Sequence, residues 1–151
     1  MNTPSKLLAG HHRKCDELFA AAEHQSQDKQ WPACRASAQG FAEELLAHFA
    51  VEEASLFPAF EQATGMTAGP TRMMRIEHEQ MRELVAELLD AAQAEDQERF
   101  LDVSDTLLVL MEQHNLKEEN VLYPMCDQAV GRDQALVTQI ENAVSSGRVT
   151  Q

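Results

Sequence analysis

An internal repeat of a histidine–glutamate motif constrains this chain more than any other feature. One copy, at residues 48–58, reads HFAVEEASLFP, and the other, at residues 114–124, reads HNLKEENVLYP. Both have the form His, three residues, Glu-Glu, two residues, Leu, an aromatic residue and Pro, and they are 66 residues apart (114 − 48). The same offset relates His12 to His78. The chain is therefore predicted to contain a duplicated two-helix unit, in which each copy supplies one histidine and then a His–Glu pair.

The spacing within each motif favours metal binding. Residues four apart lie on one face of a helix, so His48 and Glu52 point the same way, as do His114 and Glu118. With the two histidines of the earlier pair, they form a set of four imidazoles and two carboxylates. Such groups carry a large desolvation penalty when buried without partners, and two metal ions bridged by the carboxylates would remove it. A set of nitrogen and oxygen ligands without thiolate favours iron or manganese over structural zinc.

This pattern resembles the hemerythrin-like (HHE cation-binding) domain family. The signature of that family is a histidine on a first helix and His-x3-Glu on a second, followed by the same arrangement again, and the resemblance covers roughly residues 5 to 130. It implies an all-α protein, an antiparallel up-down four-helix bundle, with two non-haem iron ions bridged by carboxylates and by an oxo or hydroxo group. The ligands that it implies are His12, His48, His78 and His114 at terminal positions, with Glu52 and Glu118 bridging.

The chain departs from the oxygen-carrying hemerythrins at one position. Those proteins have a second histidine four residues after the third-helix histidine, where this chain has Arg82 after His78. A guanidinium group has no free lone pair and cannot replace that ligand. Either water fills the position, or Arg82 turns outward to a carboxylate such as Glu79 or Glu83. The departure argues against reversible oxygen carriage.

Two adjacent histidines compete for the ligand position on the first helix. His12 is preferred because it falls on the apolar stripe formed with Leu8, Cys15 and Phe19. His11 lies about 100° away around the helix. It is predicted to be an exposed residue beside the site.

The second copy of the motif has a tyrosine where the first has a phenylalanine. The phenol of Tyr123, the counterpart of Phe57, could lie near the metals, but the preferred interpretation is a packing residue. Glu53 and Glu119 directly follow the predicted bridging glutamates and lie about 100° away from them. They are predicted to be surface groups or groups around the ligands, and not ligands themselves.

Proline, glycine and capping residues predict where the helices begin and end. Helices are expected from Thr3-Pro4, from Trp31-Pro32 to about residue 55, from Pro70, from Asp96 to about residue 127, and, as a short amphipathic helix, over residues 133–145. Gly65 and Gly69 mark the loop that joins the two copies. The chain is predicted to be a single domain, 1–151, with its core at roughly residues 3–130.

The charge balance limits the classes of partner. The chain has 25 acidic and 12 basic side chains and a formal net charge of −13, which disfavours nucleic acid and anionic membranes as partners. The three cysteines are scattered, which favours reduced thiols. The N-terminal residues show no signal-peptide pattern. A cytoplasmic location is therefore expected.

The predicted site is the main evidence for function. Six protein ligands shared by two irons leave coordination positions for O2, peroxide or nitric oxide. The leading hypothesis is a non-haem di-iron protein that binds or senses such a ligand in oxidative or nitrosative stress. The alternative is a di-iron oxidase or reductase that acts on peroxide or nitric oxide, or assists iron–sulfur cluster repair, with a reductase partner. No nucleophile–base pair or phosphate-binding loop is found, so a metal-binding module is favoured over a classical enzyme. The sequence does not indicate an oligomeric state.

Overall fold

The computed structural model describes residues 2–145, and every regular element among them is helical. In chain order these elements are α1 (Pro4–Gln27), α2 (Trp31–Val51), the π-helical segment η1 (Glu52–Leu56), α3 (Phe57–Thr64), α4 (Pro70–Gln93), α5 (Gln97–Lys117), the π-helical segment η2 (Glu118–Leu122), α6 (Tyr123–Val130) and α7 (Gln134–Val144). The all-α class and the short C-terminal helix predicted from the sequence are confirmed. The two ends of the predicted 1–151 domain, residue 1 and residues 146–151, lie outside the described residues.

The repeat seen in the sequence is also a repeat of helices. Each element from α1 to α3 has a counterpart from α4 to α6, and the bounds of the two differ by 66 residues. Helix α1, for example, begins at Pro4 and ends at Gln27, whereas α4 begins at Pro70 and ends at Gln93. Two copies of one helical unit therefore build the body of the protein.

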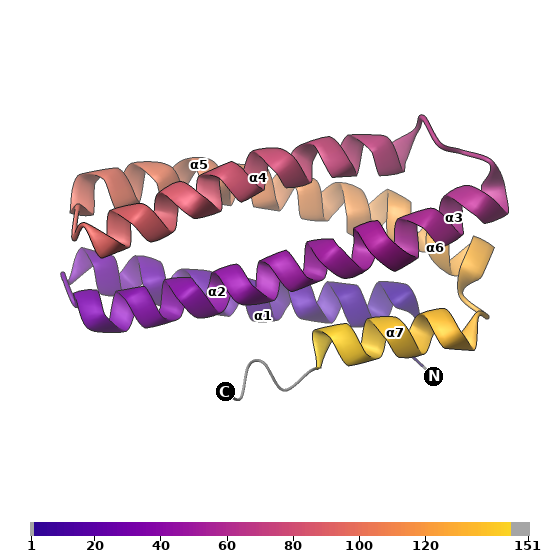
Figure 1. Ribbon diagram of the computed structural model, residues 1–151, viewed down its shortest axis with the longest axis horizontal. Helices are drawn as coiled ribbons and strands as arrows, with labels where there is room; N and C mark the ends of the chain where they lie inside the picture. The colour runs from indigo at the N-terminus through magenta and orange to yellow at the C-terminus, as the bar shows by residue number, and fades with distance from the viewer. Residues whose placement is uncertain (1, 146–151) are drawn as a thin grey trace.

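The long helices lie side by side in a helical bundle (Figure 1). Helix α1 packs against α2 and α5, and α4 packs against α5 and α2. The α1–α2 and α4–α5 turns lie at one end of the bundle, and the α3–α4 and α6–α7 connections lie at the other (Figure 1). Helix α7 packs along α1 and α2. None of the helices in residues 2–145 combines the length and the apolar character that a bilayer crossing requires.

Two apolar clusters fill the bundle, and the predicted ligands lie between them along each long helix. On α1, Leu8 belongs to one cluster and Cys15 to the other, with His12 between them. On α4, Met74 and Met81 flank His78 in the same way. The polar site is thus enclosed by apolar side chains on both sides along the bundle axis.

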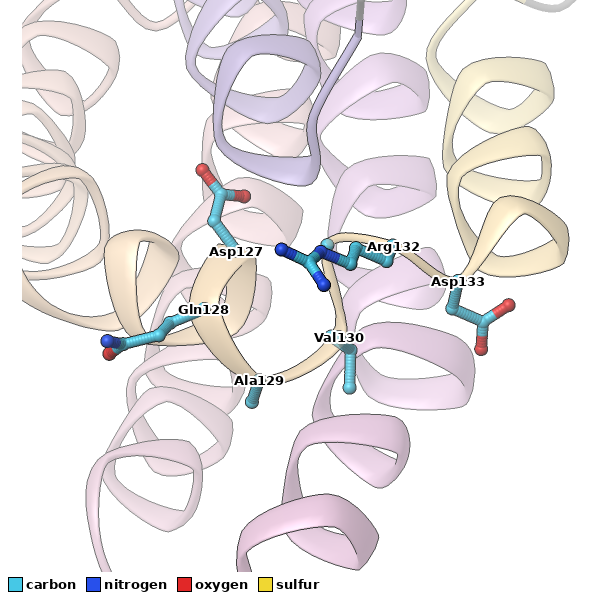
Figure 2. A pocket seen from close by; sticks show the side chains of 7 residues that line it. Asp127, Gln128, Ala129, Val130, Arg132 and Asp133 are labelled. Atoms are coloured by element: carbon cyan, nitrogen blue, oxygen red, sulfur yellow. The ribbon is translucent and has the colours of Figure 1, made fainter.

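The end of α6 is tied to the beginning of α1. Asp127 points toward α1 (Figure 2), where its carboxylate accepts hydrogen bonds from the backbone N–H of Ser5, at 3.1 Å, and from the Ser5 hydroxyl. Residues 127–133 line a hollow of about 610 Å³ at the turn that follows. A Cβ atom at Gly131 would lie 2.3 Å from the carbonyl oxygen of Asp127, so this tight turn favours glycine.

Two glycines provide a test of the helix boundaries. Gly65 ends α3 with φ +75, whereas Gly10 lies within α1, where an added Cβ atom would face open space with no neighbouring group within 4 Å. We expect Gly65→Ala to lower stability by about 1 kcal/mol because alanine is strained at positive φ. Gly10→Ala should raise stability by about 0.5–1 kcal/mol. Thermal unfolding followed by circular dichroism measures both, and shifts of Tm in the same direction would contradict the assigned boundaries.

Candidate metal centre

The structure brings the six predicted ligands together in the interior of the bundle. Each of them is at most 3% exposed. Their ligand atoms form two groups, in each of which all atoms lie within 4.8 Å of one another: Glu52, His78, His114 and Glu118 in one, and His12, His48 and Glu118 in the other. We call these groups the His78/His114 half and the His12/His48 half of the site.

The carboxylates of Glu52 and Glu118 face both halves of the site. In the His12/His48 half, Glu118 Oε1 lies 3.1 Å from His12 Nε2, and Glu52 Oε2 lies 3.4 Å from His48 Nε2. The opposite oxygens face the other histidines, at 3.1 Å from Glu52 Oε1 to His78 Nε2 and 3.2 Å from Glu118 Oε2 to His114 Nε2. Each carboxylate therefore directs one oxygen to each half, as a carboxylate that bridges two cations must.

The His78/His114 half contains buried polar atoms that make no hydrogen bond. Among the described residues these atoms are Glu52 Oε1, His78 Nε2, His114 Nε2 and Glu118 Oε2. Buried polar atoms in proteins nearly always have a hydrogen-bond partner, so four such atoms in one place require an explanation. Two imidazole nitrogens and two carboxylate oxygens are a donor set for a first-row transition-metal ion. The residues thus fit a bound metal.

The hydroxyl of Tyr123 lies beside the ligand atoms of the His12/His48 half. Its side chain is fully buried, and its hydroxyl lies 2.6 Å from Glu52 Oε2 and 2.8 Å from Glu118 Oε1. The same oxygen lies 3.1 Å from His48 Nε2 and 3.2 Å from His12 Nε2. The prediction that Tyr123 only packs is therefore wrong, because its phenol contacts four of the six predicted ligands.

The π-helical segments explain why the phenol reaches the site. The backbone N–H of Tyr123 donates to the carbonyl of Glu118, five residues earlier, and Phe57 bonds to Glu52 in the same way. A π turn holds one residue more than an α turn, so residue i+5 comes above residue i. Pro58 and Pro124 follow these residues directly and have no N–H to continue the regular pattern. The helices widen at these segments and continue beyond them.

Three of the four predicted histidine ligands donate through Nδ1 to a carboxylate. These hydrogen bonds join His12 to Glu119 Oε2 at 2.7 Å, His78 to Glu53 Oε2 at 2.6 Å and His114 to Glu77 Oε1 at 2.8 Å. Such bonds fix the tautomer and the ring orientation, and leave Nε2 directed at the site. The prediction that Glu53 and Glu119 surround the ligands is confirmed, whereas Glu77 was not found from the sequence.

His48 is held differently, and His11 is the reason. His48 Nδ1 lies 2.8 Å from His11 Nδ1, and His11 Nε2 lies 2.7 Å from Glu44 Oε1. His11 is 3% exposed, so the prediction of an exposed residue is wrong. His11 and His12 are neighbours on α1, yet both are buried because different elements cover them. His11 contacts residues of α2, whereas His12 contacts Glu118 and Glu119 in the α5–η2 region.

Arg82 turns away from the ligands. It forms a bidentate ion pair with Glu53, at 2.8 and 2.9 Å, and a hydrogen bond of 2.6 Å with Glu79. Of the two predicted alternatives, the outward orientation toward a carboxylate is the one observed. Burial tends to raise the pKa of Glu53, but the hydrogen bonds from His78 and Arg82 outweigh it and lower the pKa to about 2. Arg82 therefore keeps Glu53 ionised as an acceptor for His78.

Burial and charge shift the pKa values within the site in opposite directions. Burial lowers the pKa of His48 well below its usual value. Burial would also lower the pKa of His114, but the carboxylates of Glu118 and Glu52 outweigh it and raise the pKa to about 9. Burial and the same carboxylates raise the pKa of Tyr123 well above its usual value. Binding of a metal ion here is therefore coupled to the protonation of the histidines and of Tyr123.

Comparison with models of known protein families gives a match. A family model described as the hemerythrin HHE cation binding domain matches residues 3–126, a range that includes all six predicted ligands. No curated protein and no solved structure matches the chain.

The buried position of His11 leads to a prediction about stability. His11→Ala removes a hydrogen-bond partner of the buried Glu44 side chain, and we expect a loss of about 3 kcal/mol in the free energy of unfolding. His24 is 74% exposed, so His24→Ala is the matched control and should change stability by less than about 0.5 kcal/mol. Urea unfolding of both variants measures the difference. Equal stability of the two variants would contradict the buried role of His11.

Proposed function

This chain belongs to the hemerythrin HHE cation-binding family, and we propose that its cation site holds two non-haem iron ions. The proposal includes the antiparallel up-down arrangement of the four long helices in a single domain. The contacts of α1 with α2 and α5, and of α4 with α5 and α2, support this arrangement. So does the placement of the α1–α2 and α4–α5 turns at one end of the bundle (Figure 1).

In this proposal the two ions share the glutamates and divide the histidines. His12 and His48 are terminal ligands of one ion, and His78 and His114 are terminal ligands of the other. Glu52 and Glu118 bridge the two. The observation that carries the proposal is that each carboxylate directs one oxygen to either half, at 3.1–3.4 Å from the imidazole nitrogens that it faces. Iron suits a set of imidazoles and carboxylates without thiolate.

The proposed function is to bind or sense O2, peroxide or nitric oxide in oxidative or nitrosative stress in the cytoplasm. Bound iron supplies open coordination positions and a redox couple for these ligands. The chain surrounds the site with apolar side chains. The Phe49 ring stacks on the His78 ring with centroids 3.9 Å apart, and the centroid of the Phe57 ring lies 5.8 Å from that of His78. Carboxylates bonded to Nδ1 of His12, His78 and His114 hold these rings in place.

One observation favours a second candidate, a di-iron oxidase or reductase served by a reductase partner. Arg82 is bonded to Glu53 and Glu79 and offers no lone pair to the His78/His114 half. The His78/His114 half therefore has one nitrogen ligand fewer than the corresponding site of an oxygen-carrying hemerythrin, and it retains more positions for reacting molecules. This feature favours reaction with the small ligand over stable carriage.

Metal content tests the di-iron proposal. We expect iron-loaded protein to hold two irons per chain and to melt at a higher temperature than chelator-treated protein, since a ligand present at 1,000 times its Kd stabilises the folded state by about 4 kcal/mol. Glu52→Gln and Glu118→Gln should each remove at least one iron. Glu79→Gln, at a side chain that is 71% exposed, is the matched control and should retain both. One zinc per chain, or no metal, in the wild-type protein would refute the proposal.

Stopped-flow spectroscopy separates binding from turnover. We expect the reduced, iron-loaded protein to react with O2 and with nitric oxide in one mixing step because the ligands need only reach the open positions. A spectral change that persists without an electron donor supports the binding function. Repeated consumption of the ligand in the presence of a donor supports the oxidase or reductase. A spectrum unchanged by either gas would contradict both.

A further inference from the structure

We propose that Tyr123 is a metal ligand in the His12/His48 half, so that the two metal positions of this site are chemically unequal. The inference rests on the proposed di-iron function and names a protein ligand beyond the histidines and glutamates. Its basis is the placement of one buried phenol oxygen within 2.6–3.2 Å of a ligand atom on each of Glu52, Glu118, His48 and His12. A cation bound by these atoms lies beside the phenol oxygen.

The hydrogen bonding of this phenol is unusual for a packing residue. A hydroxyl group has one hydrogen to donate, yet two carboxylate oxygens lie within 2.8 Å of the Tyr123 oxygen. A single proton cannot fully satisfy both acceptors, whereas a cation can bind both carboxylates and the phenol oxygen together. Tyrosine oxygen is an established type of iron ligand in proteins. The buried phenol therefore suits a position in the coordination sphere of the metal.

The internal repeat provides a comparison within the same molecule. The rings of Tyr123 and His12 are stacked with centroids 5.6 Å apart and an interplanar angle of 21°. Their counterparts 66 residues earlier and later, Phe57 and His78, have centroids 5.8 Å apart at 18°. The two aromatic side chains thus have nearly the same position relative to their histidines. They differ by one hydroxyl group, present only in the His12/His48 half.

Binding of a metal ion by Tyr123 releases one proton. Without a cation, the Tyr123 hydroxyl keeps its proton and directs it at the neighbouring carboxylate oxygens of Glu52 and Glu118. When the Tyr123 oxygen binds the metal, its O–H bond breaks, an oxygen–metal bond forms and the proton leaves to solvent. The positive charge of the ion compensates the new phenolate. No oxidant or reductant is required for this step.

The difference between the halves determines where a small ligand binds. Tyr123 fills a coordination position on the ion held by His12 and His48. Phe57 offers no oxygen to the ion held by His78 and His114. The open positions for O2, peroxide or nitric oxide therefore lie in the His78/His114 half, beside Phe49 and Phe57.

Visible and resonance Raman spectroscopy of the iron-loaded protein test this inference. The protein is loaded with Fe²⁺ without oxygen and oxidised with ferricyanide, which takes one electron from each iron. We expect the wild-type protein to show a visible phenolate-to-iron charge-transfer band with enhanced tyrosine ring vibrations. Tyr123→Phe, which removes only the hydroxyl, should lose the band and still hold two irons per chain. The double variant Phe57→Tyr with Tyr123→Phe should regain a band, because the phenol is moved to the other half.

The outcomes separate this inference from the di-iron proposal. Wild-type protein that binds two irons but has no phenolate band would overturn the inference and leave the di-iron site intact. A band that persists in Tyr123→Phe would also overturn it, because it would come from elsewhere. A wild-type chain that binds no iron would instead refute the proposed function on which the inference rests. Equal iron content in wild-type protein and Tyr123→Phe shows that any lost band does not reflect misfolding.

Discussion

The structure depends on the burial of two carboxylates, Glu52 and Glu118, between the two apolar clusters of the bundle. Both side chains are fully buried, and isolated buried charges are strongly destabilising. The surrounding residues compensate this burial: imidazole nitrogens and one phenol oxygen converge on the four carboxylate oxygens, and further carboxylates hold the imidazoles from outside. A bundle core with this composition is specialised for cation binding at a cost in intrinsic stability.

The two π-helical segments convert a sequence motif into a site. In a regular helix the His-x3-Glu spacing already aligns each histidine with its glutamate. The extra residue of the π turn then brings the aromatic residue at position 57 or 123 into line with that glutamate. Proline follows at positions 58 and 124 and has no N–H for a regular helical hydrogen bond. The sequence of each copy is therefore compatible with the π turn that places the aromatic residue at the site.

The two copies share their helix bounds but differ in the residues that surround the ligands. Three pairs of equivalent positions differ. His11 in the first copy corresponds to Glu77 in the second, and each of them contacts a histidine ligand. Phe57 corresponds to Tyr123, and Asp16 corresponds to Arg82. The histidine and glutamate ligands are the same in both copies, and the differences lie around them. The two halves of the cation site therefore differ in hydrogen bonding and in the oxygen atoms that they present.

The sequence alone determined the helical class, the repeat and the six residues that converge, because a helix has a fixed period and a repeat marks equivalent positions. It determined the surroundings of those residues only in part: Glu53 and Glu119 were found from the sequence, whereas the roles of His11, Glu77 and Tyr123 were not. His11 was predicted to be exposed because one helix shows only one apolar stripe, whereas α2 and the α5–η2 region cover adjacent faces of α1. Tyr123 was predicted to pack as the counterpart of Phe57; regular helical spacing would turn it away from Glu118, and the π turn aligns the two. Burial on two sides and a local change of helical pitch are properties of the packed chain, which a periodic pattern in one segment does not contain.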